Sequence, residues 1–188
     1  MNGRNLVVIG ISTGGPFTLK DLFSRLPRLP AAFLVVLHIT PEMDYRIAMG
    51  LDAAANMPVA LAQHGERLKG GHVYLAPGGL HLQLEGNQRV KLCDGPRVNY
   101  VQPSVDVTML SLGRSFNGGK LIGAIMTGMG KDGAEGILHM KKIGGVTFAQ
   151  DEASSTIYGM PKAAVETGAI DFVLPPARMA DKLVELLR

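Results

Sequence analysis

The segment LVVIGISTGGP, residues 6–16, indicates the fold of this 188-residue chain. Its first four residues are apolar and mostly β-branched, as in a strand that is buried on both faces of a sheet. Glycines then surround a serine, and Pro16 opens a stretch that carries apolar residues at helical spacing to residue 26. The segment therefore predicts a buried strand, a glycine-rich turn and a helix in immediate succession.

The same alternation continues through most of the chain. Short apolar runs predict further strands at residues 33–37, 58–61, 121–126, 146–149 and 172–174. Helical periodicity is present at residues 45–55, 104–116, 133–142, 161–167 and 177–187. Residues 73–93 instead show short strands separated by turns. We therefore expect a single α/β domain over residues 1–188: a doubly wound, mostly parallel sheet with helices on both faces and a β-hairpin or meander insertion near residues 73–93.

Composition excludes several classes of protein. Apolar residues make up 46% of the chain and charged residues 19%, which excludes a disordered protein. The lone Cys93 excludes intrachain disulfides and cysteine-based zinc sites. The longest apolar run, residues 31–37, is far shorter than the roughly 20 residues that span a bilayer. We expect a cytoplasmic protein without a membrane-embedded part, and the scattered charges that sum to +3 predict no nucleic-acid partner.

Three predicted strands end in residues that can carry chemistry. Ser12 follows the first strand, His38 follows the second, and Asp132 lies in the loop after the strand at residues 121–126. Because parallel strands present their carboxyl ends at one edge of a sheet, these side chains are expected to meet there. A hydroxyl, an imidazole that removes its proton and a carboxylate that orients the imidazole are the components of acyl-transfer catalysis.

Each of these signals also has a simpler interpretation. The pattern G-x-S-x-G at residues 10–14 also suits a turn that binds phosphate, and His38 could be a structural histidine. Asp132 could be the N-cap of the next helix, with Glu135 completing a capping box. Residues 128–133 fit G-x-G-x-x-G, and Asp151 follows the next strand, so a dinucleotide-binding loop is a further alternative.

Five segments, in this order along the chain, together resemble the catalytic domain of the chemotaxis protein-glutamate methylesterases, the CheB family. They are IGISTGGP (residues 9–16), GHVYLAPG (71–78), PSVD (103–106), TGMGKDGA (127–134), and AQDE with YGMP (149–152 and 158–161). Each motif is short, but the series covers almost the whole chain.

The resemblance implies that Ser12 is the nucleophile, His38 the general base and Asp132 the orienting carboxylate. Backbone N–H groups of Thr13 and Met129 are the expected oxyanion donors. The family hydrolyses γ-glutamyl methyl esters on the cytoplasmic helices of methylated chemoreceptors and deamidates receptor glutamines. The resemblance implies no cofactor and no metal, and none of the usual metal-ligand spacings occurs in the sequence.

Two departures from the family pattern matter. The family usually has Gln-His-Met at the histidine, whereas this chain has Leu37-His38-Ile39. The substrate contacts beside His38 are therefore expected to differ, and a catalytically weak module that binds receptor or other helical proteins is the alternative function. Second, the catalytic segment begins within the first ten residues, so we expect a catalytic domain without a receiver domain, acting alone or under a separate regulatory protein.

Overall fold

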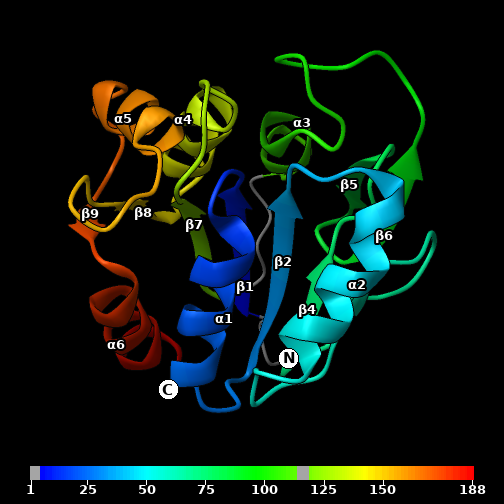
Figure 1. Cartoon of the computed structure of the whole chain (residues 1–188), viewed down its shortest axis with the longest axis horizontal. Helices are drawn as coiled ribbons and strands as arrows, with labels where there is room; N and C mark the ends of the chain where they lie inside the picture. Colours follow the sequence, from blue (N-terminus) through cyan, green and yellow to red (C-terminus); the bar gives the residue numbers. More distant parts are fainter. Residues whose placement is uncertain (1–4, 114–118) are drawn as a thin grey trace.

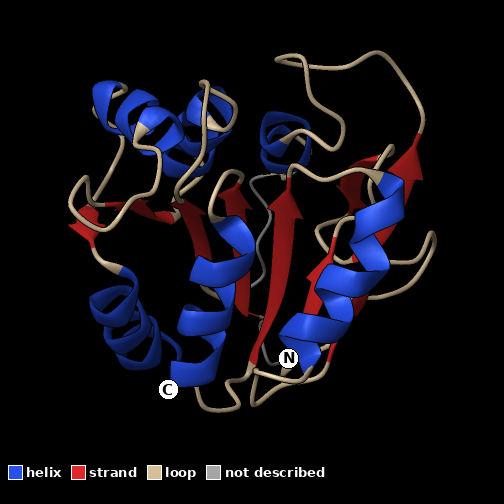
Figure 2. Cartoon of the chain, viewed as in Figure 1, coloured by secondary structure: helices blue, strands red, loops and turns tan. Residues whose placement is uncertain are grey.

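The computed structural model describes residues 5–113 and 119–188, and a parallel β-sheet lies at the centre of this part of the chain (Figures 1 and 2). Its seven strands have the order β3-β4-β2-β1-β7-β8-β9, and every neighbouring pair is parallel. The strands are β1 Asn5–Ile11, β2 Ala31–Leu37, β3 Val59–Leu61, β4 His72–Leu75, β7 Leu121–Ile125, β8 Val146–Gln150 and β9 Phe172–Leu174. The predicted α/β class with a mostly parallel sheet is confirmed.

Helices cover both faces of the sheet, as the predicted doubly wound architecture requires. They are α1 Gly15–Arg25, α2 Pro41–Asp52, α3 Val105–Leu110, α4 Ala134–Lys142, α5 Gly159–Glu166 and α6 Pro176–Leu187. Alternate residues of β1 face opposite sides: Val7 and Ile9 pack in one core with α1, α2 and α6, and Leu6 and Val8 in the other with α3, α4 and α5. Among the described residues, no helix is both long and apolar enough to cross a membrane.

A separate two-stranded sheet lies beside the second core. Strands β5 His81–Glu85 and β6 Arg89–Cys93 form an antiparallel hairpin, which the turn pattern predicted. The first segment of the expected meander lies elsewhere, because residues 72–75 form β4 and pair in parallel with β2. Val73, Tyr74 and Leu75 are all buried, so this run fits between two strands of the central sheet rather than in a partly exposed hairpin.

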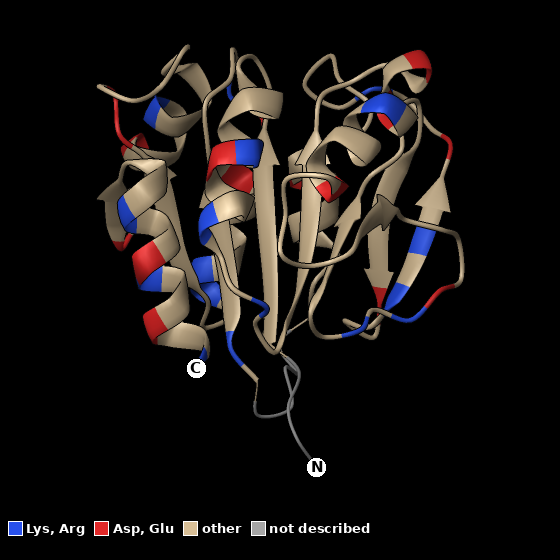
Figure 3. Ribbon diagram, turned by 60° about the horizontal axis from the view of Figure 1, so that its bottom comes forward, with Lys and Arg blue, Asp and Glu red and all other residues tan. Residues whose placement is uncertain are grey.

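The helix expected at residues 104–116 is shorter than predicted. α3 ends at Leu110, where the hydroxyl group of Ser111 donates to the carbonyl oxygen of Thr108 over 2.6 Å and Leu112 N–H bonds Met109 O. Residues 114–116 lie outside the described part of the structure. Charged residues of both signs are distributed along several helices and strands (Figure 3).

The strand order determines where a site can form. β2, β1 and β7 are neighbours at the middle of the sheet, and Ile11 pairs with Leu37 while Gly10 pairs with Ile125. The loops that follow these three strands therefore leave the sheet side by side. They are the loops that carry Ser12, His38 and Asp132.

Candidate active site

Ser12 stands at the sharp turn between β1 and α1. Its N–H group donates to Thr127 O over 2.8 Å, and its carbonyl oxygen accepts from Gly15 N over 2.7 Å. Gly14, with φ of 81°, is the N-cap of α1 in the left-handed region, which glycine enters without steric cost. The glycine pattern around the serine therefore reflects a real constraint on the backbone.

The loop after β7 packs directly against this turn. A Cβ atom at Gly128 would lie 2.8 Å from Ser12 Cβ and would also collide with the sulfur of Met160. The hydroxyl group of Thr127 donates to Thr13 O over 2.9 Å and so fastens the two loops together. Only a residue without a side chain permits this approach to Ser12.

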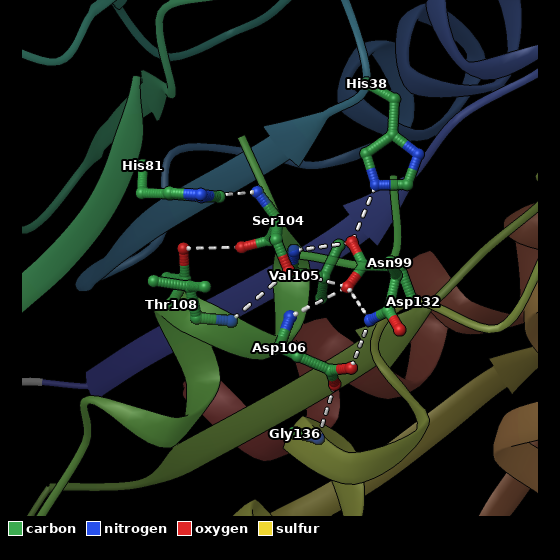
Figure 4. Close-up of polar contacts among 10 residues, drawn as sticks. His38, His81, Asn99, Ser104, Val105, Asp106, Thr108, Asp132 and Gly136 are labelled. Carbon is green, nitrogen blue, oxygen red and sulfur yellow. Dashed lines mark hydrogen bonds and ion pairs between the residues drawn. The ribbon is translucent and has the colours of Figure 1, made fainter. Parts of the chain in front are cut away.

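His38 and Asp132 form a direct contact at the same edge of the sheet (Figure 4). His38 Nε2 lies 2.7 Å from Asp132 Oδ2, with side chains 10% and 2% exposed. Because Asp132 accepts at Nε2, Nδ1 is the ring nitrogen left to accept a proton; it faces away from Asp132 in Figure 4.

The backbone brings Ser12 to this pair. His38 N–H donates to Ile11 O over 3.2 Å, so His38 lies beside the end of the strand that leads into Ser12. Within residues 5–113 and 119–188, no hydrogen bond joins the Ser12 hydroxyl to the His38 ring. Such bonds are often long in free enzymes and tighten when substrate binds.

Asp132 is held by an unusually complete set of donors. Its Oδ2 accepts from His38 Nε2 over 2.7 Å and from Val105 N over 2.7 Å. Its Oδ1 accepts from three donors: Ser104 Oγ over 2.7 Å, Asn99 Nδ2 over 3.0 Å and Asp106 N over 3.2 Å. Burial by itself raises the pKa of Asp132, but the hydrogen bonds outweigh burial and hold this pKa below its ordinary value. Asp132 is therefore ionised at neutral pH.

A second buried carboxylate, Asp106, lies next to Asp132. Its Oδ1 accepts from Gly136 N over 2.7 Å, and its Oδ2 accepts from Asn99 Nδ2 over 2.8 Å. Burial raises the pKa of Asp106, the charge of Asp132 adds to this rise, and the hydrogen bonds from Gly136 and Asn99 oppose it. Two carboxylates with pKa values shifted in opposite directions thus share one buried cluster.

The interpretation of Asp132 as the N-cap of α4 is wrong. The N-cap is Gly133, with φ of 96°, and no side chain caps this helix. The Asp132 carboxylate instead accepts from the first two N–H groups of α3, those of Val105 and Asp106. It is directed to the start of another helix, and Glu135 therefore completes no capping box with it.

The two expected oxyanion donors lie in the loops next to Ser12. Thr13 and Met129 are both exposed, Met129 by 74%. In the described part of the chain, neither backbone N–H group donates a hydrogen bond to the protein. Both groups are therefore free to bind an incoming oxygen atom.

Two cavities adjoin the cluster, and Tyr100 lines both of them. One, of about 260 Å³, is lined by His38, Ile39, Thr40, Pro41, Gly79, Arg97, Tyr100, Val101 and Gln102. The other, of about 460 Å³, is lined by Arg97, Asn99, Tyr100 and Lys131. Tyr100 is 92% exposed, so its side chain is accessible from solvent.

The geometry does not favour the dinucleotide alternative. Asp132 brings a negative charge into the loop at residues 128–133, where a pyrophosphate would need N–H donors. Asp151, the acid expected to bind a ribose, is engaged by the N–H and hydroxyl groups of Ser154. Among the described residues, no group of three or more His, Cys, Asp and Glu side chains is placed to hold a metal ion.

Sequence reasoning assigned no role to Asn99, Ser104 or Asp106. Ser104 and Asp106 belong to the segment PSVD, whose pattern predicts only the start of a helix. Asn99 lies in an irregular stretch between β6 and α3, where no periodicity marks it. One feature of the sequence could have indicated these roles. Asn99 and Ser104, which are neutral hydrogen-bond donors, and the acid Asp106 lie close together just before and at the start of a predicted helix.

Comparison with known proteins places the chain in one family. Residues 7–183 match the CheB methylesterase family. The chain is 43% identical over 185 residues to a protein-glutamate methylesterase/protein-glutamine glutaminase of Archaeoglobus fulgidus, covering 96% of this chain and 53% of the relative. It is 40% identical over 192 residues to the protein of the same name from Pyrococcus horikoshii, covering 98% of this chain and 52% of that one.

These curated relatives are longer proteins, so the chain spans about half of their length. Among solved structures, it is similar to the Thermotoga maritima CheB methylesterase catalytic domain, with a TM-score of 0.91 and 38% identity. That match covers 97% of this chain and 98% of the other. The likeness therefore extends over the whole of that catalytic domain.

Proposed function

The chain belongs to the CheB methylesterase family, and on this basis we propose that it is a serine hydrolase that demethylates γ-glutamyl methyl esters and deamidates glutamines on proteins. The observation that carries the proposal is the 2.7 Å contact between His38 Nε2 and Asp132 Oδ2 at the loop edge where Ser12 lies. Ser12 is the proposed nucleophile, His38 the general base and Asp132 the carboxylate that orients it.

In the first step, Ser12 Oγ attacks the carbonyl carbon of the ester while His38 Nδ1 accepts the hydroxyl proton. The ionised Asp132 stabilises the resulting imidazolium through Nε2. The N–H groups of Thr13 and Met129 bind the negative oxygen of the tetrahedral intermediate. The bond to the methoxy group then breaks, and the proton on His38 leaves with methanol.

In the second step, water attacks the acyl-enzyme and His38 accepts one of its protons. Collapse of the second tetrahedral intermediate releases the glutamate carboxyl group and returns the proton to Ser12 Oγ. An amide substrate follows the same route, with ammonia leaving in place of methanol. Both activities therefore require the same three side chains.

The proposed substrates are methylated cytoplasmic helices of chemoreceptors. Three large apolar side chains stand exposed on or near the three loops: Phe17 by 82%, Met129 by 74% and Tyr100 by 92%. Side chains of this kind, together with shallow cavities, suit the surface of a protein substrate better than a small molecule that is enclosed on all sides. One glutamyl side chain would reach the serine while the helix remains outside.

Methanol release from methylated receptor cytoplasmic fragments tests the proposal. We expect release by the unaltered protein and none above background by Ser12→Ala. Equal release by the two proteins would contradict the role of Ser12. A serine-directed phosphonate supplies a second readout, because it should label Ser12 stoichiometrically; tight receptor binding without any labelling would instead support the binding-module alternative.

A further inference from the structure

Asn99 occupies a turn whose backbone conformation is uncommon for its sequence. Val98 and Val101 exchange two backbone hydrogen bonds of 3.1 Å, which closes a turn around Asn99 and Tyr100. Both central residues have positive φ, 52° and 67°. Asparagine tolerates this region, but a tyrosine is rarely found there, and glycine is the residue that such turns favour.

The side chain of Asn99 bridges the two buried carboxylates of the cluster. A single nitrogen, Nδ2, donates to Asp106 Oδ2 over 2.8 Å and to Asp132 Oδ1 over 3.0 Å. Asp106 and Asp132 are only 3% and 2% exposed, so solvent does little to screen the repulsion between their charges. An amide supplies two N–H bonds from one atom without carrying a charge.

The absence of charge on this bridge matters for His38. A lysine or arginine at the same place would form an ion pair with Asp132 and compete with the imidazolium for the carboxylate. Asn99 satisfies Oδ1 and leaves the negative charge of Asp132 available at Oδ2, where His38 binds. Asp106, held by Gly136 N, in turn holds the amide in place.

We propose that Asn99 is a positioning residue of this hydrolase, whose side-chain amide separates Asp106 from Asp132 and keeps Asp132 directed at His38. The inference rests on the proposed function, because it concerns the base of the same reaction. It assigns the turn at residues 98–101 two tasks: Tyr100 faces the two cavities, and the neighbouring Asn99 side chain faces the buried carboxylates.

The variant Asn99→Gly distinguishes a role of the side-chain amide from a role of the turn conformation. Glycine suits a positive φ at least as well as asparagine, so the turn is retained and only the amide is lost. We expect kcat for methanol release to fall on the order of tenfold to a hundredfold, as displaced catalytic groups do, with a much smaller change in KM. A residue that serves the turn alone would leave kcat unchanged.

The pH profile supplies a readout that a structural role would not move. Without the amide, the Asp132 carboxylate has one hydrogen-bond donor fewer, so it interacts more strongly with the imidazolium form of His38. The acid limb of kcat/KM should therefore move to higher pH in Asn99→Gly. Asn99→Asp keeps the shape of the side chain but adds a third carboxylate to the cluster, and it should lose more activity at neutral pH than the glycine variant.

Asn87→Gly is the matched control. Asn87 also has a positive φ, of 56°, in the β5–β6 turn, and its side chain exchanges two hydrogen bonds with the backbone of Gly113. This variant should keep both kcat and the acid limb. Thermal melting verifies that each variant is folded; if Asn99→Gly does not fold, Asn99→Ser, with one donor, should show a smaller loss and the same direction of pH shift.

The outcome is decisive in either direction. If the unaltered protein releases methanol and folded Asn99→Gly matches it in kcat and in pH profile, the positioning role is wrong while the proposed function stands. If the unaltered protein releases no methanol, the proposed function fails. The rate of phosphonate labelling at Ser12 then still compares Asn99→Gly with its parent, and equal rates would also overturn the positioning role.

Discussion

Asp132 accepts a 2.7 Å hydrogen bond from Nε2 of His38, a residue 94 positions earlier in the chain. This contact fixes the tautomer of the imidazole ring, so that Nδ1 is the basic nitrogen. In the proposed mechanism Asp132 is therefore part of the base, because Nδ1 is the one ring nitrogen that can accept the proton of Ser12. The first prediction follows from this dependence.

Asp132→Asn should reduce kcat by roughly 10³- to 10⁴-fold, because an amide at this position favours the wrong tautomer of the base. Methanol release under single-turnover conditions measures the effect. Asp21→Asn is the control, since Asp21 forms an ion pair with the exposed Arg25 on α1 and should not affect kcat. An Asp132→Asn enzyme with a tenth or more of the parent activity would refute the assigned role.

Stability at acid pH should depend on the donors to Asp132. Its pKa is lowered in the folded protein, so its contribution is fully present above the unfolded value of about 3.9 and is lost as the pH falls through the lower folded value. Asp106, whose pKa is raised, acts in the opposite direction: its ionised form costs stability, and this cost disappears as the pH falls through its raised folded value. Below about pH 4 the protonation of Asp132 should therefore lower the free energy of unfolding.

Ser104→Ala tests this dependence. Without the Ser104 hydroxyl the folded pKa of Asp132 moves up toward its unfolded value, so the free energy of unfolding in urea should fall less steeply between pH 4 and pH 2. Loss of the cap of α3 also costs about 1 kcal/mol at every pH. Ser111→Ala, which removes a hydroxyl from the other end of α3, should lower stability without changing the slope; equal slopes in all three proteins would contradict the prediction.

Gly128→Ala should disable the reaction while leaving the fold intact. The added methyl group would meet Ser12 Cβ at 2.8 Å, so the two loops must separate. A displacement of about 1 Å at the nucleophile costs on the order of a hundredfold in kcat/KM. Gly95→Ala, where an added Cβ meets no atom within 4 Å, should behave like the parent, and the prediction is wrong if the two variants cannot be distinguished.

Arg97 and Lys131 should favour acidic sequence around the scissile ester. Both cations are exposed and line the 460 Å³ cavity. Arg97→Glu with Lys131→Glu should raise KM about threefold to tenfold for a substrate with neighbouring glutamates, and added salt should reduce the difference. A substrate with neutral neighbours should respond little.

The double variant Lys69→Glu with Lys142→Glu is the control for net charge. It makes the same change in charge at two other exposed lysines. Its KM should match that of the parent protein for both substrates. If it instead raises KM as much as the variant at the cavity, the effect comes from the overall charge of the domain and the assignment to Arg97 and Lys131 is incorrect.

The sequence predicted the parts of the site that follow directly from strand ends. Ser12, His38 and the loop of Asp132 each come after an apolar run, and parallel pairing alone brings their loops to one edge. The position of β4 could not be predicted in this way. A short buried strand has the same local pattern in a hairpin and in a parallel sheet, and its partnership with β2 depends on contacts distant in sequence.

Hydrophobic periodicity could not predict the roles of Asn99 and Asp106, for a different reason. Their roles arise from where side chains meet, between an irregular turn and the first residues of a six-residue helix. For Asp132 the capping interpretation was wrong, because its carboxylate accepts from the first N–H groups of α3 and not from those of the adjacent α4. Local rules identify a group that needs donors, and only the tertiary structure identifies which donors it finds.

The central position of β7 in the sheet has a consequence for synthesis of the protein. Ser12 and His38 precede residues 121–125 in the chain, and Asp132 can join them only after that segment has inserted beside β1. A growing or truncated polypeptide that stops before that insertion carries an unactivated hydroxyl group. The proposed ester cleavage should therefore appear during synthesis only after β7 has paired with β1.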